Sequence, residues 1–276
     1  MQVKYHSHPD SVKFFDMAQL RSEFVSDDLM TNNKLILHYT IFDRFIYGSA
    51  VPVGESISLP TFDALKSDYF LQRREMGVMN VGGKGSITVD GTHYEMNNGD
   101  VLYLGRGTKE VAFASNDASD PARYYINSCP AHAEYPVTKA TRDDANRVDL
   151  GDQAHANKRV IYQYIHEDGI QSCQLVMGYT ELMPGNIWNT FPPHTHDRRM
   201  EVYFYFDLPS DEVVMHFMGE PSNTKHVALR NYNAVISPPW SIHAGAGTNA
   251  YKFAWGMAGE NQAFTDMDGV AYGDLS

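Results

Sequence analysis

Short runs of apolar residues, separated by turn residues, cover most of the chain. Runs of about four to eight residues rich in β-branched and aromatic side chains predict strands. In the N-terminal half they predict strands over 34–42, 77–81, 86–89, 101–104, 111–114 and 123–127. Asp90-Gly91 and Asn98-Gly99 stand between such runs and favour tight hairpin turns. This spacing is typical of an antiparallel β-sandwich or barrel.

A second series of the same kind predicts strands over 159–165, 173–181, 200–206, 212–218, 226–229, 234–237 and 251–257. Residues 136–158, between the two series, are polar and lack apolar periodicity, so we expect a linker or a surface crossing there. We place the domain boundary in this segment, which predicts domains of residues 1–145 and 146–276. Residues 73–78 align weakly with 198–203, and residues 100–109 with 234–243, so the two domains are expected to be similar.

One helical pattern lies in residues 11–30, where Phe14, Leu20 and Phe24 recur at near-helical spacing. We interpret it as a helix that packs on the domain core. The chain is therefore expected to be all-β apart from a short N-terminal helix.

Four residues form a candidate metal site. Alternate residues of a strand lie on one face, so His194 and His196 are expected to present two imidazoles to the same side. Glu201 adds a carboxylate shortly afterwards, and His243 follows a proline-rich turn further along. Three imidazoles and one carboxylate suit Zn²⁺, Fe²⁺, Mn²⁺, Ni²⁺ or Co²⁺ and leave positions open for a substrate, as in a catalytic site. His216 has no partner at ligand spacing, and we expect it to be structural.

Composition and charge narrow the function. The formal net charge of −12 opposes binding to nucleic acid. No apolar stretch approaches the roughly 20 residues of a membrane span, and the N-terminus lacks a secretory signal, so we expect a cytoplasmic protein. The two cysteines, Cys129 and Cys173, lie far apart in the sequence and are expected to be reduced.

The histidine pair with Glu201, and the later run Ile236–His243, resemble the two sequence motifs of the cupin superfamily. The glycine of the first motif is displaced to Gly185, and Trp240 stands where the second motif has glycine, but neither change removes a ligand. The longer runs 71–85, 194–206, 236–243 and 255–262 are similar to the 5-keto-4-deoxyuronate isomerase family. This resemblance covers essentially the whole chain.

The resemblance implies two tandem cupin domains, each a jelly-roll β-barrel. It implies one zinc ion in the C-terminal domain, held by residues matching His194, His196, Glu201 and His243. The corresponding N-terminal positions are Tyr69, Leu71, Met76 and Lys109, so that domain is expected to have no metal site. The family also implies a homohexamer, a small uronate substrate, and a place in pectin and unsaturated-uronate breakdown in the bacterial cytoplasm.

The implied reaction is an aldose-to-ketose isomerisation of 5-dehydro-4-deoxy-D-glucuronate to 3-deoxy-D-glycero-2,5-hexodiulosonate. The carbonyl moves from carbon 1 to carbon 2, either through an enediolate or by a hydride shift. An iron-dependent cupin dioxygenase with the same ligands is the alternative enzyme class. A sugar-responsive binding module is a third possibility, but the chain shows no DNA-reading element.

Strand alternation also suggests residues that act on the substrate. Tyr203 and Tyr205 share the parity of Glu201 and are candidate catalytic phenols, although both could equally be core aromatics. Arg199 shares that parity and is a candidate to bind the substrate carboxylate. Trp188 and Asn189 precede the histidine pair and are expected to line the site.

Overall fold

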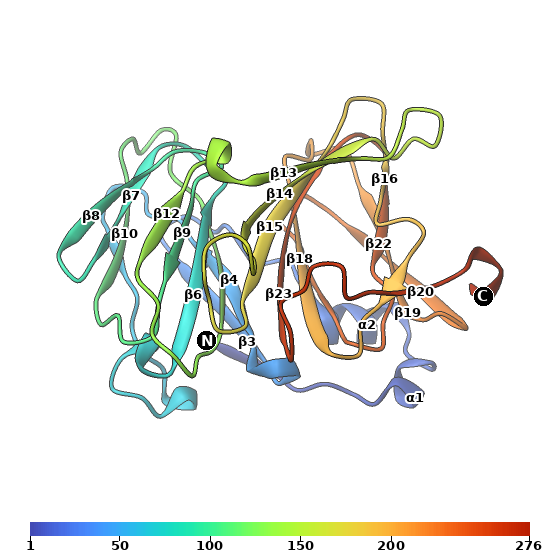
Figure 1. Ribbon diagram of the computed structural model, residues 1–276, viewed down its shortest axis with the longest axis horizontal. Coiled ribbons are helices and arrows are strands. Elements are labelled where there is room, and N and C mark those ends of the chain that lie inside the picture. The colour runs from blue at the N-terminus through green and yellow to red at the C-terminus, as the bar shows by residue number, and fades with distance from the viewer. The chain divides into compact units, whose positions relative to one another are not determined.

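The computed structural model describes residues 1–276 and consists mainly of strands, which confirms the predicted all-β class (Figure 1). The chain divides into two compact units. The first comprises residues 1–4, 28–145 and 164–177, and the second comprises residues 5–27, 146–163 and 178–276. The predicted domains, 1–145 and 146–276, differ from these units in the membership of residues 5–27 and 164–177.

The first unit contains two sheets. The larger has the strand order β1-β3-β4-β11-β6-β9-β12 and the smaller the order β5-β10-β7-β8. The larger sheet consists of β1 (Gln2–Lys4), β3 (Leu35–Thr40), β4 (Ile46–Ala50), β6 (Arg74–Asn80), β9 (Val101–Leu104), β11 (Tyr124–Pro130) and β12 (Thr138–Ala140). The smaller consists of β5 (Ile57–Ser58), β7 (Gly85–Val89), β8 (Thr92–Met96) and β10 (Val111–Ser115). Single turns of 3₁₀-helix occur at η1 (Phe42–Arg44), η2 (Asp63–Leu65), η3 (Phe70–Gln72) and η4 (Arg142–Asp144).

The two predicted turns have different roles. Asp90 and Gly91 have φ angles of 46° and 83° and join β7 to β8, with Val89 opposite Thr92. Positive φ at both central residues matches the twist of the paired strands, so this hairpin prediction is confirmed. Asn98-Gly99 instead leads from β8 in one sheet to β9 in the other. It makes no hairpin, because strands in different sheets do not pair.

The interior of the first unit is apolar. Its buried core includes Leu71 and Met76, which are 1% and 0% exposed. These are two of the positions that align with the metal ligands of the other half. Each buried side chain of this size contributes about 1.5 to 3 kcal/mol through removal from water. The barrel interior of the first unit is therefore filled by packing residues at these positions.

A buried carboxylate holds residues 164–177 in the first unit. Glu75 on β6 is 0% exposed. Its oxygens accept hydrogen bonds from the backbone N–H groups of Cys173 (2.7 Å), Gln174 (2.9 Å) and Leu175 (2.9 Å). The hydroxyl of Tyr103 donates a fourth, at 2.8 Å. An ionised buried carboxylate is tolerable only with such a complete set of donors, so this loop and this strand depend on each other.

The second unit repeats the arrangement of two sheets. The larger has the order β13-β14-β15-β23-β18-β21-β2 and the smaller the order β16-β22-β19-β20. The larger sheet consists of β2 (Val25–Ser26), β13 (Asn146–Leu150), β14 (Arg159–Ile165), β15 (Val176–Leu182), β18 (Arg199–Phe206), β21 (Ala234–Ser237) and β23 (Lys252–Gly259). The smaller consists of β16 (Trp188–Asn189), β19 (Val214–Glu220), β20 (Asn223–Leu229) and β22 (Ala244–Gly247). A third pair joins β17 (His194–Thr195) to β24 (Asp268–Gly269), and a 3₁₀ turn, η5 (Tyr272–Asp274), follows.

The predicted helix over 11–30 is wrong in its extent. The structure has a single turn, α1 (Pro9–Val12), and a longer helix, α2 (Met17–Phe24). Asp16 starts α2 with a capping box, in which its side chain accepts from the Gln19 N–H at 2.8 Å and its own N–H donates to Gln19 at 2.9 Å. The helix ends at Phe24 because Val25 and Ser26 extend and pair with β21. No helix of the structure has the length and apolarity that crossing a bilayer requires.

The segment 136–158, which was predicted to be a linker or a surface crossing, contains two strands. It contains β12, which pairs with β9, and β13, which pairs with β14. Strand β13 is mostly exposed along its length. An edge strand that buries neither face needs no apolar alternation, so the sequence pattern carried no sign of it.

We expect Glu75→Gln to lower the free energy of unfolding by about 3 kcal/mol or more, because an amide NH₂ would face backbone donors that need an acceptor. Urea denaturation would measure the change. Glu110→Gln, at an exposed glutamate of the same unit, is the control and should change stability by less than about 0.5 kcal/mol. A similar small change for both variants would contradict the role of Glu75.

Candidate metal centre

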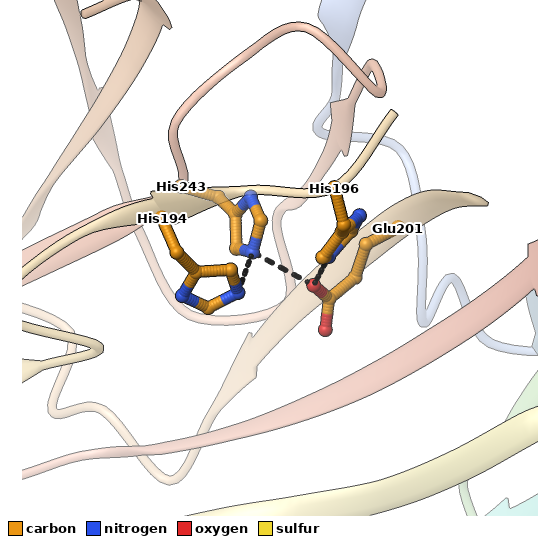
Figure 2. Close-up of side chains that lie close together, drawn as sticks. All are labelled: His194, His196, Glu201 and His243. Atoms are coloured by element: carbon orange, nitrogen blue, oxygen red, sulfur yellow. Dashed lines mark hydrogen bonds and ion pairs between the residues drawn. The ribbon is translucent and has the colours of Figure 1, made fainter. Parts of the chain in front are cut away.

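Four side chains from separate segments converge inside the second unit, as Figure 2 shows. His194 lies in β17, and His196 follows directly after that strand. Glu201 lies in β18, and His243 immediately precedes β22. The structure therefore brings together all four ligands that were predicted from the sequence. Three of them are buried and His194 is partly exposed.

The ligand atoms lie at the separations of a coordination shell. His243 Nε2 is 3.0 Å from His194 Nε2 and 3.0 Å from Glu201 Oε2. His196 Nε2 is 3.3 Å from the same carboxylate oxygen. All four ligand atoms lie within 4.8 Å of one another. Metal–ligand distances of about 2.0 to 2.2 Å place neighbouring ligand atoms roughly 3 to 3.5 Å apart, so the group has the size of a metal site.

Backbone carbonyls set the proton positions of two of the rings. His196 Nδ1 is 2.9 Å from the carbonyl oxygen of Arg199. His243 Nδ1 is 3.3 Å from the carbonyl oxygen of Ser241. A carbonyl can only accept a hydrogen bond, so in both rings the hydrogen belongs on Nδ1. Each Nε2 is then left with a lone pair that points into the site, as in metal-binding histidines.

The pKa values of His194 and Glu201 indicate the charges of these two side chains. Burial and the neighbouring His243 lower the pKa of His194 to about 2, so its ring is neutral at physiological pH. Burial alone would raise the pKa of Glu201, but His243 and His196 outweigh it and hold that pKa well below its usual range. The neutral ring of His194 and the ionised carboxylate of Glu201 therefore face the same point as the rings of His196 and His243.

Facing lone pairs repel unless something positive lies between them. A proton on one histidine would satisfy a single contact of the group, whereas a divalent cation satisfies all four ligands at once. The residues present therefore fit a metal ion. Their mixture of nitrogen and oxygen donors suits Zn²⁺ and the neighbouring transition metals.

A cavity of about 400 Å³ opens beside His194 and Glu201. Its walls come from β14, β18 and β23, from residues 190–193 and from the C-terminal segment 264–269. Apolar and aromatic side chains make most of the lining, among them Ile161, Tyr203, Phe253, Trp255, Met257 and Phe264. A mostly apolar cavity of this volume with a few polar groups is typical of a small-molecule site.

Two arginines fasten the C-terminal segment over this cavity. Arg198 pairs with Asp266 and Asp268, both at 2.8 Å. Arg199 donates through Nη1 to the carbonyl of Ala263 at 2.6 Å, and through Nη2 to the carbonyls of Phe264 and Asp266, each at 3.1 Å. Both terminal nitrogens of Arg199 are thus occupied. The bidentate pairing with a substrate carboxylate that the sequence suggested for Arg199 does not fit this geometry.

The two candidate tyrosines occupy different places. Tyr203 lines the cavity, and its hydroxyl lies 3.0 Å from Thr190 Oγ1. Tyr205 does not line the cavity, because its hydroxyl lies deeper in the barrel, 2.8 Å from His216 Nδ1. Burial raises the pKa of both phenols well above the ordinary value, so both stay protonated.

Trp188 and Asn189 lie outside the cavity lining. They form β16 in the smaller sheet, where Trp188 stacks on Phe217 with ring centroids 5.8 Å apart. Asn189 is fully buried and donates to the hydroxyl of Tyr251 at 2.5 Å. Asn189 therefore packs inside the barrel, whereas the half-buried Trp188 packs on the half-buried Phe217 of the neighbouring part of the sheet. Neither residue reaches the ligand site that they precede in the sequence.

Two residues near the site lie outside the predicted set: Arg159 was missed, and His216 was expected to be structural. Arg159, the first residue of β14, lines the cavity and donates to the carbonyl of Asn157 at 2.9 Å. His216 on β19 is fully buried, and its Nε2 has no hydrogen-bond partner. Burial and the nearby His243 lower the pKa of His216 to about 3, so its ring is neutral. Neither residue belongs to a spaced motif, and only the folding of the sheets brings them near the ligands.

Comparisons with known proteins place this arrangement among enzymes. Residues 48–272 match the KduI/IolB family. A protein of Formosa agariphila named 4-deoxy-L-threo-5-hexosulose-uronate ketol-isomerase is 54% identical over 267 residues, which are 97% of this chain and 95% of that protein. A protein of the same name from Lachnoclostridium phytofermentans is 52% identical over 275 residues, covering 100% of both chains.

The fold has solved counterparts as well. The crystal structure of an IolB-like protein from Salmonella typhimurium LT2 superposes with a TM-score of 0.71 and 17% sequence identity. The superposition covers 90% of this chain and 96% of that one. At this identity the likeness concerns the fold alone.

We expect His243→Ala to reduce bound metal to below about a tenth of the normal content, because it removes a central ligand of the set. Elemental analysis of the purified protein would measure this, alongside its circular dichroism spectrum. His226→Ala, at an exposed histidine of the same unit, is the matched control and should keep the full metal content. A His243→Ala protein that retains metal would refute the assignment of this ligand.

Proposed function

This chain belongs to the KduI/IolB family, and we propose that it is a metal-dependent ketol-isomerase acting on 4-deoxy-L-threo-5-hexosulose uronate, the compound in the names of its relatives. The product would be 3-deoxy-D-glycero-2,5-hexodiulosonate, formed by moving the carbonyl from carbon 1 to carbon 2. Ketol-isomerase activity follows from relatives that are 54% and 52% identical over nearly the whole chain. These relatives also favour an isomerase over the dioxygenase alternative.

One observation supports this substrate most directly. Two of the candidate ligands, His194 and Glu201, line the same cavity as Arg159, an arginine without a carboxylate partner. A keto-uronate has a carbonyl with an adjacent hydroxyl at one end and a carboxylate at the other. The cavity offers a partner for each of these groups.

We propose Zn²⁺ as the metal, held by His194, His196, Glu201 and His243. A bound divalent cation would act as a Lewis acid that polarises a carbonyl and lowers the pKa of the adjacent hydroxyl. The four protein ligands leave room for a substrate on the cavity side, where His194 is partly exposed. The carbonyls of Arg199 and Ser241 keep two of the rings oriented for this purpose.

Arg159 is the proposed partner of the substrate carboxylate. Its guanidinium makes one hydrogen bond in the chain, from Nη1 to Asn157, and forms no ion pair. The remaining N–H groups of the fork are available for a planar carboxylate. Burial lowers the pKa of Arg159, but a guanidinium remains charged at neutral pH. Partial burial strengthens its attraction for an anion relative to an exposed arginine.

The residues that line the cavity affect whether the hydrogen moves from carbon 2 to carbon 1 as a proton or as a hydride. Among the lining residues, Glu201 is the only carboxylate and His194 the only imidazole, and both belong to the ligand set. Tyr203 remains protonated and can donate a hydrogen bond to a substrate oxygen. The walls therefore provide no free base to carry a proton from carbon 2 to carbon 1. This favours direct hydride transfer between the two carbons over an enediolate.

The resemblance to this family supports two further proposals, about the assembly and about the metabolic role. We propose a homohexamer as the assembly, and a place in the breakdown of pectin and unsaturated uronates in the bacterial cytoplasm. The acidic net charge of −12 agrees with a partner that is a small molecule rather than a nucleic acid.

Incubation of the metal-loaded protein with 4-deoxy-L-threo-5-hexosulose uronate in D₂O should yield the 2,5-diketo acid without deuterium at carbon 1. Proton NMR would follow both the conversion and the isotope. No conversion would refute the proposed substrate. Deuterium at carbon 1 would refute the direct transfer and make the Tyr203→Phe variant the next protein to measure.

We expect Arg159→Gln to raise KM for the uronate by about 10- to 100-fold while kcat changes little, because the lost ion pair lies away from the reacting carbons. Steady-state kinetics would measure both constants. Lys158→Gln, at the neighbouring exposed residue, is the control and should leave KM unchanged. Equal KM values for Arg159→Gln and the control, with normal metal content, would exclude this role for Arg159.

A further inference from the structure

The first unit contains a second cavity, which plays no part in the proposed function. It has a volume of about 270 Å³, roughly the space of nine water molecules at 30 Å³ each. Three arginines line it, Arg44, Arg73 and Arg74, together with Tyr39, Ser67 and Phe70. No aspartate or glutamate lines it.

Arg74 lies at the buried side of this cavity. It is the first residue of β6 and is only 6% exposed. Its Nε donates to Ser128 Oγ at 3.1 Å, and its Nη2 donates to the carbonyls of Arg44 (2.6 Å) and Ser128 (2.9 Å). The guanidinium lies over the Tyr39 ring, with Cζ 5.7 Å from the ring centroid. Its Nη1 makes no hydrogen bond within the chain, and Arg74 forms no ion pair.

The other two arginines lie at the exposed side. Arg73 donates through Nη2 to the carbonyls of Leu65 (2.5 Å) and Lys66 (2.9 Å). The side chain of Arg44 is exposed and bonds to nothing in the chain. Its backbone has a positive φ of 50°, which is uncommon for a residue with a side chain. All three guanidinium groups are therefore satisfied only by neutral acceptors, or by none.

This concentration of positive charge is unusual in an acidic chain. The net charge is −12, yet no carboxylate lines this cavity. The nearby Glu75 attracts Arg74 electrostatically, but its oxygens accept from Tyr103 and from the backbone of residues 173–175 and make no ion pair with an arginine. Burying a guanidinium without a counter-ion costs several kcal/mol, and neutral carbonyls compensate only part of that cost. An anion in the cavity would supply the missing charge. Arginine forks match the planar edge of a carboxylate or the oxygens of a phosphate.

We propose that this cavity is a binding site for a small oxyanion, a carboxylate or phosphate compound, separate from the metal centre. Nη1 of Arg74 and the fork of Arg44 would bind its oxygens, and the rings of Tyr39 and Phe70 would contact its carbon skeleton. The site lies within the first unit, whose own barrel interior is apolar at the positions that align with the metal ligands. The first unit would therefore bind a small molecule independently of the metal centre in the second unit.

Isothermal titration of the purified, metal-containing chain with inorganic phosphate, and separately with D-glucuronate, tests the inference. We expect saturable binding of at least one of them, with one anion per chain. Arg44→Gln should weaken the affinity by about tenfold, since it removes a charged donor whose side chain holds nothing else in place. Lys84→Gln, at an exposed lysine of the same unit, should change it less than about twofold.

A third variant separates this site from the catalytic cavity. Arg159→Gln should leave the anion affinity unchanged. If Arg159→Gln abolishes binding and Arg44→Gln does not, the anion occupies the metal cavity and the inference is wrong. Equal effects of Arg44→Gln and Lys84→Gln, or the absence of saturable binding by both anions, would also overturn it. A changed assembly mass for Arg44→Gln in light scattering, without anion binding, would show that a second copy covers the cavity.

Discussion

Four side chains that can each offer an electron pair to a metal meet inside the second unit, and the surrounding structure prevents two of the rings from turning away. The carbonyls of Arg199 and Ser241 hold the Nδ1 protons of His196 and His243, so both Nε2 atoms point at the same place. Rotating either ring would break a hydrogen bond in a buried environment, which costs more than the bond itself contributes. A divalent cation would satisfy all four side chains at once, so the group fits a metal ion. The cavity opens beside two of these side chains, and the C-terminal segment forms part of its wall.

The same architecture serves different purposes in the two units. Strand β18 carries Glu201 into the barrel, whereas the aligned position of β6 carries Met76 into an apolar core. The arginines near the two cavities differ in how many donors they keep free. Arg199 is buried and satisfies backbone carbonyls of the segment that covers the cavity, while Arg159 and Arg44 keep donors free. A guanidinium nitrogen that has no partner in the chain, such as Nη1 of Arg74, remains available to an anion whatever the other nitrogens bind.

Much of the fold was readable from the sequence, because strands with one buried face alternate and tight turns need particular residues. The predicted strands at 101–104, 159–165 and 234–237 match β9, β14 and β21 residue for residue. Strand β4 was missed because both of its faces are buried and it contains Gly48, so it shows no alternation. The exposed strand β13 was missed for the opposite reason. The helix was predicted too long because its apolar spacing continues into the strand that follows it.

The four residues of the candidate metal site could be predicted from the sequence, since His194, His196 and Glu201 are close along the chain and His243 ends a recognisable turn. It also determined the family, through runs of residues that extend over the whole chain. Which arginine side chain has donors free for a substrate became visible only in the folded structure. Strand alternation predicted that Arg199 and Tyr205 could contact the substrate. In the structure, Arg199 donates its hydrogen bonds to carbonyls of the C-terminal segment, and the hydroxyl of Tyr205 is enclosed inside the barrel beside His216. Arg159 reaches the cavity from β14, a strand far away in the sequence. Parity along one strand fixes a side chain's direction, but its hydrogen-bond partners come from segments far away in the sequence.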